Sequence, residues 1–273
     1  MKEPNSKLSL QKIAKATLAA GASVALIHAI HAATLDRRVV YTEVPFYSKK
    51  VPKEMNGYRI ALVTDTHRIS EIRLQDVVNV LNTKRLDLLL LGGDYADVQE
   101  KVWNSMALLS KVKATDGIFG VAGNHDDDKK LFPMMETHNI TPLANNGVYI
   151  RDHFYLAGIE DLTRRSPDIA KATSRATADS FVLLLSHNPD VSMLQDTAHV
   201  DLMLCGHTHG GHITLFGLWA PALPFATHYG GRFSSGWARS RDGVPVFVSR
   251  GVGESLPRMF ARPQVVVVTL FCG

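Results

Sequence analysis

The chain has 273 residues, of which 45% are hydrophobic and 21% are charged, and its formal net charge is +4 at pH 7. This length is enough to bury a full core, and the composition is that of an ordinary folded protein. The mild positive charge fits an acidic substrate or an anionic membrane surface, and no basic run with interleaved aromatic residues indicates nucleic-acid binding. The two cysteines, Cys205 and Cys272, form no Cys-x-x-Cys motif and leave the redox compartment open.

The N-terminal segment, residues 1–35, combines lysines with an uncharged apolar run. Lys2, Lys7, Lys12 and Lys15 precede residues 16–35, which contain no charged side chain and are rich in alanine. Three interpretations stay open: a membrane anchor, a cleaved signal peptide, and a soluble or interfacial helix. The excess of positive residues before the run favours a single membrane anchor with a cytoplasmic N-terminus and the rest of the chain outside the cytoplasm.

A folded domain is expected over residues 57–273, after a linker or edge segment at 36–56. Apolar periodicity predicts, in order, a strand at 58–64, a helix at 72–85, a strand at 86–91, a helix at 100–113 and a strand at 117–122. Such alternation predicts an α/β layered domain whose site lies beyond the carboxyl ends of the strands.

The second half of the chain is less regular. Strands are expected at 147–152, 154–159, 181–185, 201–205, 244–249 and 265–271. Arg164 and Arg165 end a charged loop and are expected to form a solvated turn. The apolar residues 215–225 are expected to fold over the domain core, with exposure to a membrane or an acyl chain as the alternative.

Side chains that bind metals follow five of the predicted strands: Asp65, His67, Asp94, Asn124, His187, His207 and His209. In extended chain, His207 and His209 would leave the same face, and the glycines around them permit a close approach of the backbone. Oxygen and nitrogen donors without thiolate favour Mn, Zn or Fe over a structural zinc site. Seven donors suit two ions about 4 Å apart with a bridging carboxylate, an arrangement used for displacement at phosphorus.

The order of these motifs resembles that of the calcineurin-like metallophosphoesterase superfamily, from about Tyr58 to Leu270. The matching motifs are Asp-x-His at 65–67, Gly-Asp-x-x-Asp at 93–97, Gly-Asn-His-Asp at 123–126, the lone His187, and Gly-His-x-His at 206–209. Residues 185–190, 206–211 and 248–253, with Arg262-Pro263, resemble more narrowly a bacterial branch with an N-terminal hydrophobic segment. That branch includes cell-envelope phosphodiesterases and a UDP-2,3-diacylglucosamine pyrophosphatase.

The resemblance implies a four-layer α/β/β/α sandwich of two mixed β-sheets flanked by helices. It assigns Asp65, His67 and His209 to a first ion. Asn124, His187 and His207 would hold a second ion, and Asp94 would bridge the two. His125 would stabilise or protonate the leaving oxygen, and Asp97 would orient His125. Arg68 and His212 are further candidates for substrate contact.

The expected function is that of a dinuclear metal-dependent phosphohydrolase that cleaves a phosphodiester or a pyrophosphate by attack of a metal-bridging hydroxide. A lipid-linked or cell-envelope substrate and membrane association through the N-terminal segment belong to the same expectation. Two alternatives are a phosphomonoesterase or protein phosphatase, and an inactive membrane-anchored metal-binding scaffold.

Overall fold

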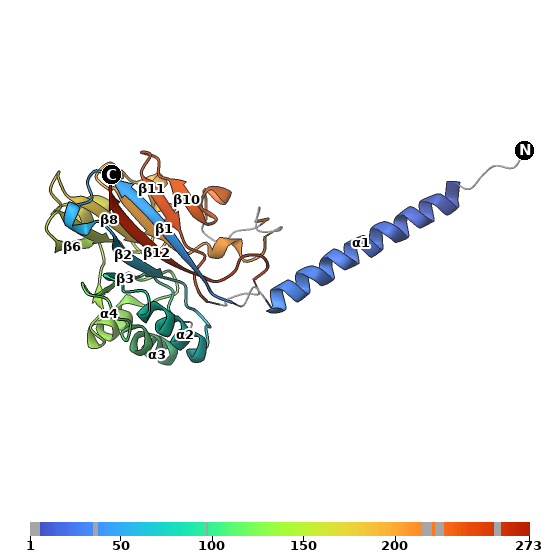
Figure 1. The fold of residues 1–273 in the computed structure, drawn as a ribbon, viewed down its shortest axis with the longest axis horizontal. Coiled ribbons are helices and arrows are strands. Elements are labelled where there is room, and N and C mark those ends of the chain that lie inside the picture. The colour runs from blue at the N-terminus through green and yellow to red at the C-terminus, as the bar shows by residue number, and fades with distance from the viewer. Residues whose placement is uncertain (1–5, 35–37, 97, 215–219, 222–226, 254–257) are drawn as a thin grey trace, which may run out of the picture.

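Two six-stranded mixed sheets form the centre of the domain in the computed structural model (Figure 1). The structure describes residues 6–34, 38–96, 98–214, 220–221, 227–253 and 258–273. Inward-facing side chains of both sheets form one apolar layer, to which Leu62, Leu90, Leu185 and Leu204 contribute. Burial of this layer between the sheets supplies most of the apolar contact that holds them together.

The first sheet contains the strands that precede three of the candidate ligand motifs. Its order is β1 (Val40–Ser48), β12 (Gln264–Cys272), β2 (Tyr58–Val63), β3 (Leu88–Leu91), β4 (Ile118–Gly120) and β5 (Thr141–Pro142). Strands β2 to β5 run parallel, so their carboxyl ends share one edge of the sheet. Strand β12 pairs antiparallel with β2 and parallel with β1.

The second sheet delivers the remaining motifs. Its order is β10 (Gly236–Arg239), β11 (Pro245–Val248), β9 (Leu202–Cys205), β8 (Phe181–Ser186), β7 (Phe154–Gly158) and β6 (Asn146–Arg151). The four central strands are parallel, whereas the edge strands β10 and β6 are antiparallel to their neighbours. Strands β8 and β9 therefore end on the same side.

Helices cover the outer face of each sheet. The first sheet is covered by α2 (Glu71–Asn82), α3 (Gln99–Leu109) and α4 (Asp128–Thr137), which Figure 1 shows together on one side of the domain. Helix α2 buries Leu74, Val77, Val78 and Leu81, the spacing of one helical face, and the hydroxyl of Ser70 caps its first turn. Among the described residues, the second sheet carries only the short helices α5 (Ile169–Thr173) and α6 (Val191–Leu194). The expected α/β/β/α sandwich is confirmed.

The predicted strands and helices correspond to observed elements, with ends that differ by a few residues. Residues 36–56, expected as a linker or an edge segment, contain β1, which lies at the edge of the first sheet, and the short 3-10 helix η1 (Lys53–Met55). The sheet therefore begins earlier in the chain than residue 57. Proline in β1 is tolerated there because an edge strand leaves one side unpaired. Two further 3-10 helices are η2 (His209–Gly211) and η3 (Gly230–Phe233).

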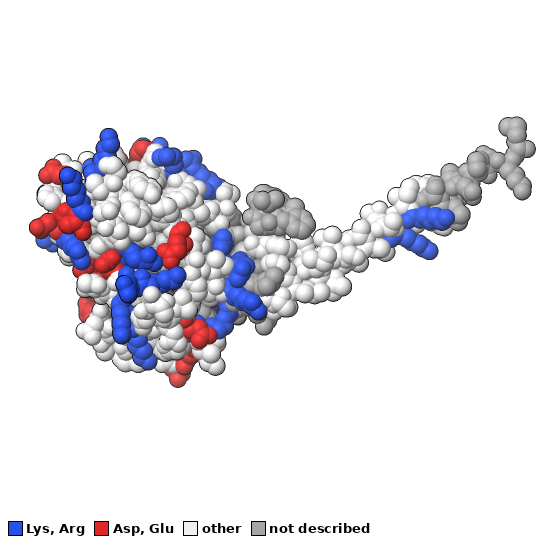
Figure 2. All heavy atoms as spheres, in the orientation of Figure 1, with Lys and Arg blue, Asp and Glu red and all other residues white. Residues whose placement is uncertain are grey.

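Helix α1 (Ser6–Thr34) extends away from the sandwich (Figure 1). Its residues Leu10–Thr34 are long and apolar enough to cross a membrane. Figure 2 shows this helix as a mostly uncharged rod with blue basic atoms near its outer end. At the inner end, the rings of His28 and His31 lie 4.8 and 4.1 Å from the ring of Phe260.

Candidate metal centre

The seven candidate ligands gather where the carboxyl ends of the two sheets meet. Asp65 and His67 follow β2, Asp94 follows β3, and Asn124 follows β4. From the second sheet, His187 follows β8, and His207 and His209 follow β9. Parallel strands place their ends at one edge, which explains why segments far apart in the sequence converge here.

The backbone at these strand ends is left-handed at five of the seven residues. The φ angles are 53° at Asp65, 37° at His67, 57° at Asp94, 72° at His207 and 52° at His209. Such conformations are unfavourable for residues other than glycine and tend to occur at functional sites. The expectation that His207 and His209 lie in extended chain is wrong, because this turn alternates left-handed and right-handed residues. The two imidazoles consequently reach two different groups of donors.

Two glycines allow the segments to meet so closely. A Cβ atom at Gly206 would collide with the side chains of Thr64 and Asp65, and one at Gly123 would collide with the carboxylate of Asp94. Any larger residue at either position would therefore push the candidate ligands apart.

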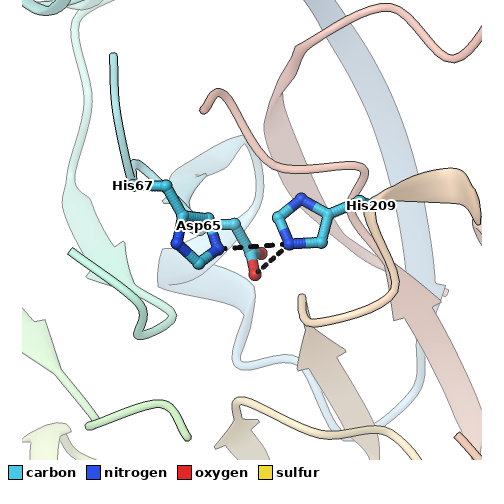
Figure 3. Close-up of side chains that lie close together, drawn as sticks. All are labelled: Asp65, His67 and His209. Carbon is cyan, nitrogen blue, oxygen red and sulfur yellow. Dashed lines mark hydrogen bonds and ion pairs between the residues drawn. The ribbon is translucent and has the colours of Figure 1, made fainter. Parts of the chain in front are cut away.

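The first group of donors consists of Asp65, His67 and His209 (Figure 3). Nε2 of His209 lies 3.2 Å from Nε2 of His67 and 3.5 Å from Oδ1 of Asp65. The hydroxyl of Thr64 donates to Oδ2 of Asp65 at 2.7 Å, and the backbone N–H of His207 donates to the same carboxylate. These hydrogen bonds hold the carboxylate in one orientation.

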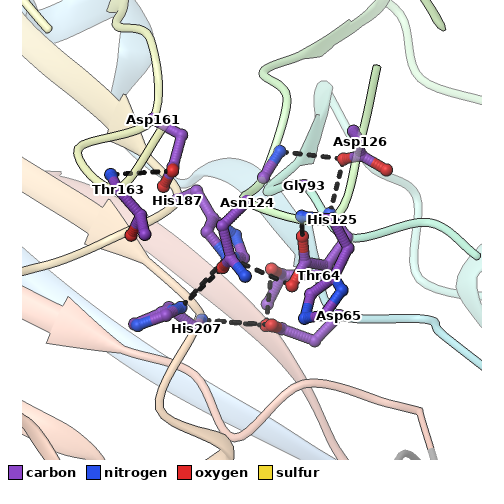
Figure 4. Close-up of polar contacts among 12 residues, drawn as sticks. Thr64, Asp65, Gly93, Asn124, His125, Asp126, Asp161, Thr163, His187 and His207 are labelled. Atoms are coloured by element: carbon purple, nitrogen blue, oxygen red, sulfur yellow. Dashed lines mark hydrogen bonds and ion pairs between the residues drawn. The ribbon is translucent and has the colours of Figure 1, made fainter. Parts of the chain in front are cut away.

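The second group consists of Asn124, His187 and His207 (Figure 4). Oδ1 of Asn124 lies 3.0 Å from both Nε2 of His187 and Nδ1 of His207, and these two nitrogens are 3.3 Å apart. Nδ1 of His187 lies 2.8 Å from the carbonyl oxygen of Gly92. Because a carbonyl only accepts, Nδ1 carries the proton there, and Nε2 is the nitrogen directed at the centre.

Asp94 joins the two groups. Its Oδ2 atom lies 3.5 Å from Nε2 of His67 in the first group and 3.4 Å from Nε2 of His187 in the second. The other carboxylate oxygen accepts the backbone N–H of His125 at 2.8 Å.

The donors fit divalent metal ions. Two ligand atoms bound at about 2.1 Å to the same ion, at angles of about 90–110°, lie about 3.0–3.4 Å apart. The separations within both groups, 3.0 to 3.5 Å, match this spacing. The donors are carboxylate, amide and imidazole groups without thiolate, which suits the catalytic type of metal site.

The buried position of the donors shifts their pKa values strongly. Burial lowers the pKa of His187, but the carboxylates of Asp94 and Asp65 outweigh it and raise this pKa well above its usual value. Burial raises the pKa of Asp94, yet the nearby His187 and His67 lower it well below its usual range.

Burial and the charge of His187 lower the pKa of His207 to about 3. Burial and the charge of Arg258 lower the pKa of His209, so that both of these imidazoles are neutral at pH 7.

Asp126, whose role the Gly-Asn-His-Asp motif leaves undefined, connects two of the ligand loops (Figure 4). Its Oδ2 atom accepts the backbone N–H groups of Asp94 at 2.7 Å and Gly123 at 2.8 Å, and its Oδ1 atom accepts that of Tyr95 at 3.1 Å. The side chain therefore fixes the loop after β3 against the loop after β4. Its position inside the Gly-Asn-His-Asp motif is the signal that could have indicated this function.

Arg258 is a positioning residue that sequence reasoning missed. It is buried, with 4% exposure, and donates to the carbonyl oxygens of Gly253, Ala261, Gly251 and His209 at 3.0 to 3.3 Å. These bonds hold the turn that carries His209 against the segment before β12. No motif marks Arg258, because its partners are backbone carbonyls, three of them nearby in the sequence and one at His209.

A cavity of about 300 Å³ opens over the centre. It is lined by Asp94, Asn124, His125, Thr163, Arg164, His207 and His209. The ring of His125 lies 5.3 Å from that of His67 and faces this space. Asp97, the expected partner of His125, lies outside the described residues.

The other expected contacts have different outcomes. His212 is buried and stacks on His209 with ring centroids 4.4 Å apart. Arg68 is exposed and is not among the described residues that line the cavity. Most of the apolar segment 215–225 lies outside the described residues. The expected solvated turn at Arg165 is wrong, because its guanidinium donates to the carbonyl oxygens of Gly123 and Asp126 at 3.2 and 2.6 Å.

Comparison with known proteins agrees with this fold and shows the family of the chain. The calcineurin-like phosphoesterase family matches residues 58–211, which include all seven candidate ligands. An "uncharacterized metallophosphoesterase" of Helicobacter pylori (strain ATCC 700392 / 26695) is 32% identical over 237 residues, which cover 81% of this chain and 61% of the relative. The chain belongs to the calcineurin-like phosphoesterase family. Members of this family bind divalent metal ions.

Further relatives include proteins that are named for membrane segments. A "transmembrane protein with metallophosphoesterase domain" of Danio rerio is 30% identical, over 85% of this chain and 57% of the relative. The "uncharacterized metallophosphoesterase YkuE" of Bacillus subtilis (strain 168) is 29% identical, over 84% of each chain. The chain thus spans about three-fifths of the length of the Helicobacter and Danio relatives. One solved crystal structure shares the fold, with a TM-score of 0.51, 10% identity, and coverage of 78% of this chain and 95% of the other.

Proposed function

We propose that the chain is a dinuclear metal-dependent phosphohydrolase that cleaves a phosphodiester or a pyrophosphate. The observation that carries this proposal is the position of Asp94, whose Oδ2 atom lies within 3.5 Å of a nitrogen from each donor group. A carboxylate shared in this way suits two ions better than one. We assign Asp65, His67 and His209 to one ion, Asn124, His187 and His207 to the other, and Asp94 to both.

When bound, such a pair of ions supplies a nucleophilic hydroxide near neutral pH and neutralises charge on phosphoryl oxygens. The chain's own residues would fix the geometry of the reaction. Asp126 and Arg258 hold the loops that carry the ligands, and hydrogen bonds to Asp65 and Asp94 keep both carboxylates in place. Preorganisation of this kind avoids reorganisation during the chemical step.

His125 is our candidate for the proton donor to the leaving oxygen. It lines the cavity beside Asn124 and Asp94, and its backbone N–H donates to the bridging carboxylate. The backbone that carries its imidazole is therefore held beside the centre. We retain Asp97 as the group that orients this ring.

The test uses the full chain in detergent, stripped of metal and reloaded with Mn²⁺ or Zn²⁺. We expect hydrolysis of bis-p-nitrophenyl phosphate, and slower hydrolysis of the monoester p-nitrophenyl phosphate. Faster cleavage of the monoester would favour a phosphomonoesterase or a protein phosphatase. No turnover of these esters or of a dinucleoside diphosphate with either metal would support the inactive scaffold instead.

The membrane part of the proposal rests on helix α1 and on the transmembrane relative. We propose that α1 anchors the chain, that the catalytic domain lies outside the cytoplasm, and that the substrate is lipid-linked or belongs to the cell envelope. A topology reporter fused after Gly273 tests the side of the membrane: alkaline phosphatase should be active there and a cytoplasmic fluorescent protein dark. For the substrate, a nucleotide–diacylglucosamine should be cleaved faster than the generic diester.

A further inference from the structure

The loop between β7 and α5 places an arginine over the candidate metal centre. Arg164 lines the same cavity as Asp94, Asn124, His207 and His209, and it is the only lysine or arginine among the described residues that do so. The four other residues are donors of the centre, whereas Arg164 is exposed. This difference in exposure places the guanidinium nearer to solvent than the ligands.

The backbone that carries Arg164 is fixed on both sides. Oδ1 of the buried Asp161 accepts the backbone N–H groups of Thr163 at 2.9 Å and Arg164 at 3.2 Å (Figure 4). The next residue, Arg165, donates to the carbonyl oxygens of Gly123 and Asp126 and pairs with the carboxylate of Asp128. The turn is thereby bound to the loop that carries Asn124 and His125.

The side chain of Arg164 remains available in this fixed turn. No described residue forms a hydrogen bond or an ion pair with its guanidinium. The neighbouring Arg165, in contrast, uses its guanidinium to hold the loops together. An arginine of this kind presents several N–H donors in a planar arrangement that matches a phosphate.

We propose that Arg164 binds a second phosphoryl group of the substrate, and that the substrate is a diphosphate diester. This inference rests on the proposed function, because the donors deep in the cavity would hold the reacting phosphoryl group. A group that reaches the exposed guanidinium must lie further out, on the part of the substrate that extends toward solvent. A simple diester has no second anionic phosphorus to offer, whereas a diphosphate has one directly beside the first.

The experiment compares two substrates in the full metal-loaded chain. Bis-p-nitrophenyl phosphate contains one phosphorus, and a P1,P2-dinucleoside diphosphate contains two. We expect Arg164→Gln to lower kcat/KM for the diphosphate about tenfold or more, mainly through KM, as is usual for the loss of a charge-assisted hydrogen bond. The bis-p-nitrophenyl phosphate rate should change less than about twofold, and Arg164→Lys should restore part of the loss.

The matched control is Arg175→Gln, which removes an exposed arginine that does not line the cavity. It should leave both substrates unaffected, and thermal unfolding should be unchanged in all variants. Equal losses on both substrates, no loss on the diphosphate, or a wild-type chain that cleaves only the simple diester would overturn the inference. A wild-type chain that cleaves neither substrate would contradict the proposed function, and this inference with it.

Discussion

Nε2 of His187 lies 3.4 Å from Oδ2 of Asp94, and both side chains are buried. The carboxylate raises the pKa of His187 well above its usual value, in spite of the opposing effect of burial. In the metal-free chain His187 therefore keeps its proton at neutral pH. A metal ion would occupy the position of this proton, since a ligand nitrogen must be unprotonated.

Metal binding should therefore release about one proton from His187 at pH 7. Because the raised pKa keeps the proton bound through neutral pH, the apparent metal affinity should increase with pH, about tenfold per unit for one proton released. Titration calorimetry of the stripped full chain in buffers of different ionisation enthalpy measures the number of protons. His207 and His209 have lowered pKa values and should contribute none. A metal affinity that does not depend on pH between 6 and 8 would contradict this prediction.

Substitution of the shared carboxylate should strongly reduce activity. Asp94→Asn preserves the shape of the side chain but removes the negative charge between the two donor groups, so we expect a loss of at least about 100-fold in kcat/KM and less than two ions per chain. His209→Ala should have a comparable effect. The exposed His199 offers a control, since His199→Ala should retain wild-type activity and metal content. Elemental analysis measures the metal content of each variant, and rate measurements give its activity. Full activity of Asp94→Asn would refute our ligand assignment.

The effect of His125→Asn should depend on the leaving group. A proton donor matters little for p-nitrophenolate, which leaves without protonation, and more for a basic alkoxide, where general acid catalysis contributes about 100-fold or more. A series of aryl and alkyl phosphodiesters should show a steeper dependence of rate on leaving-group pKa in the variant than in the wild type. If all esters slow by the same factor, His125 acts by binding phosphate and not by donating a proton.

Loss of Arg258 should destabilise the turn that carries His209. Arg258→Met leaves four backbone carbonyls without their buried donor, which we expect to lower the free energy of unfolding by about 2–4 kcal/mol. Urea unfolding of the metal-free full chain in detergent measures this change, and metal affinity should fall with it. The exposed Arg241 provides a comparison, because Arg241→Met should stay within about 0.5 kcal/mol of the wild type. Equal stability of the two variants would show that Arg258 is dispensable.

The elements that could be predicted are those with strong local patterns. Strand β3 consists of four buried leucines, and α2 buries four residues with helical spacing. Strand β1 lacks such a pattern, since buried and exposed side chains alternate along only part of its nine residues and it includes Pro45. It becomes a strand because β12 offers it a free edge, and that pairing joins residues more than 200 positions apart.

The candidate ligands could be named from the sequence because their chemistry is local: carboxylates, an amide and imidazoles directly follow apolar strands. The contacts of Asp94 with both His67 and His187 are a property of the folded chain. So are the left-handed turns at His207 and His209, the buried contacts of Arg258, and the different surroundings of Arg164 and Arg165. The physical reason is that composition and periodicity report only what each segment prefers by itself. Backbone strain, burial and the partners of a charged group depend instead on segments that meet only when the two sheets pack.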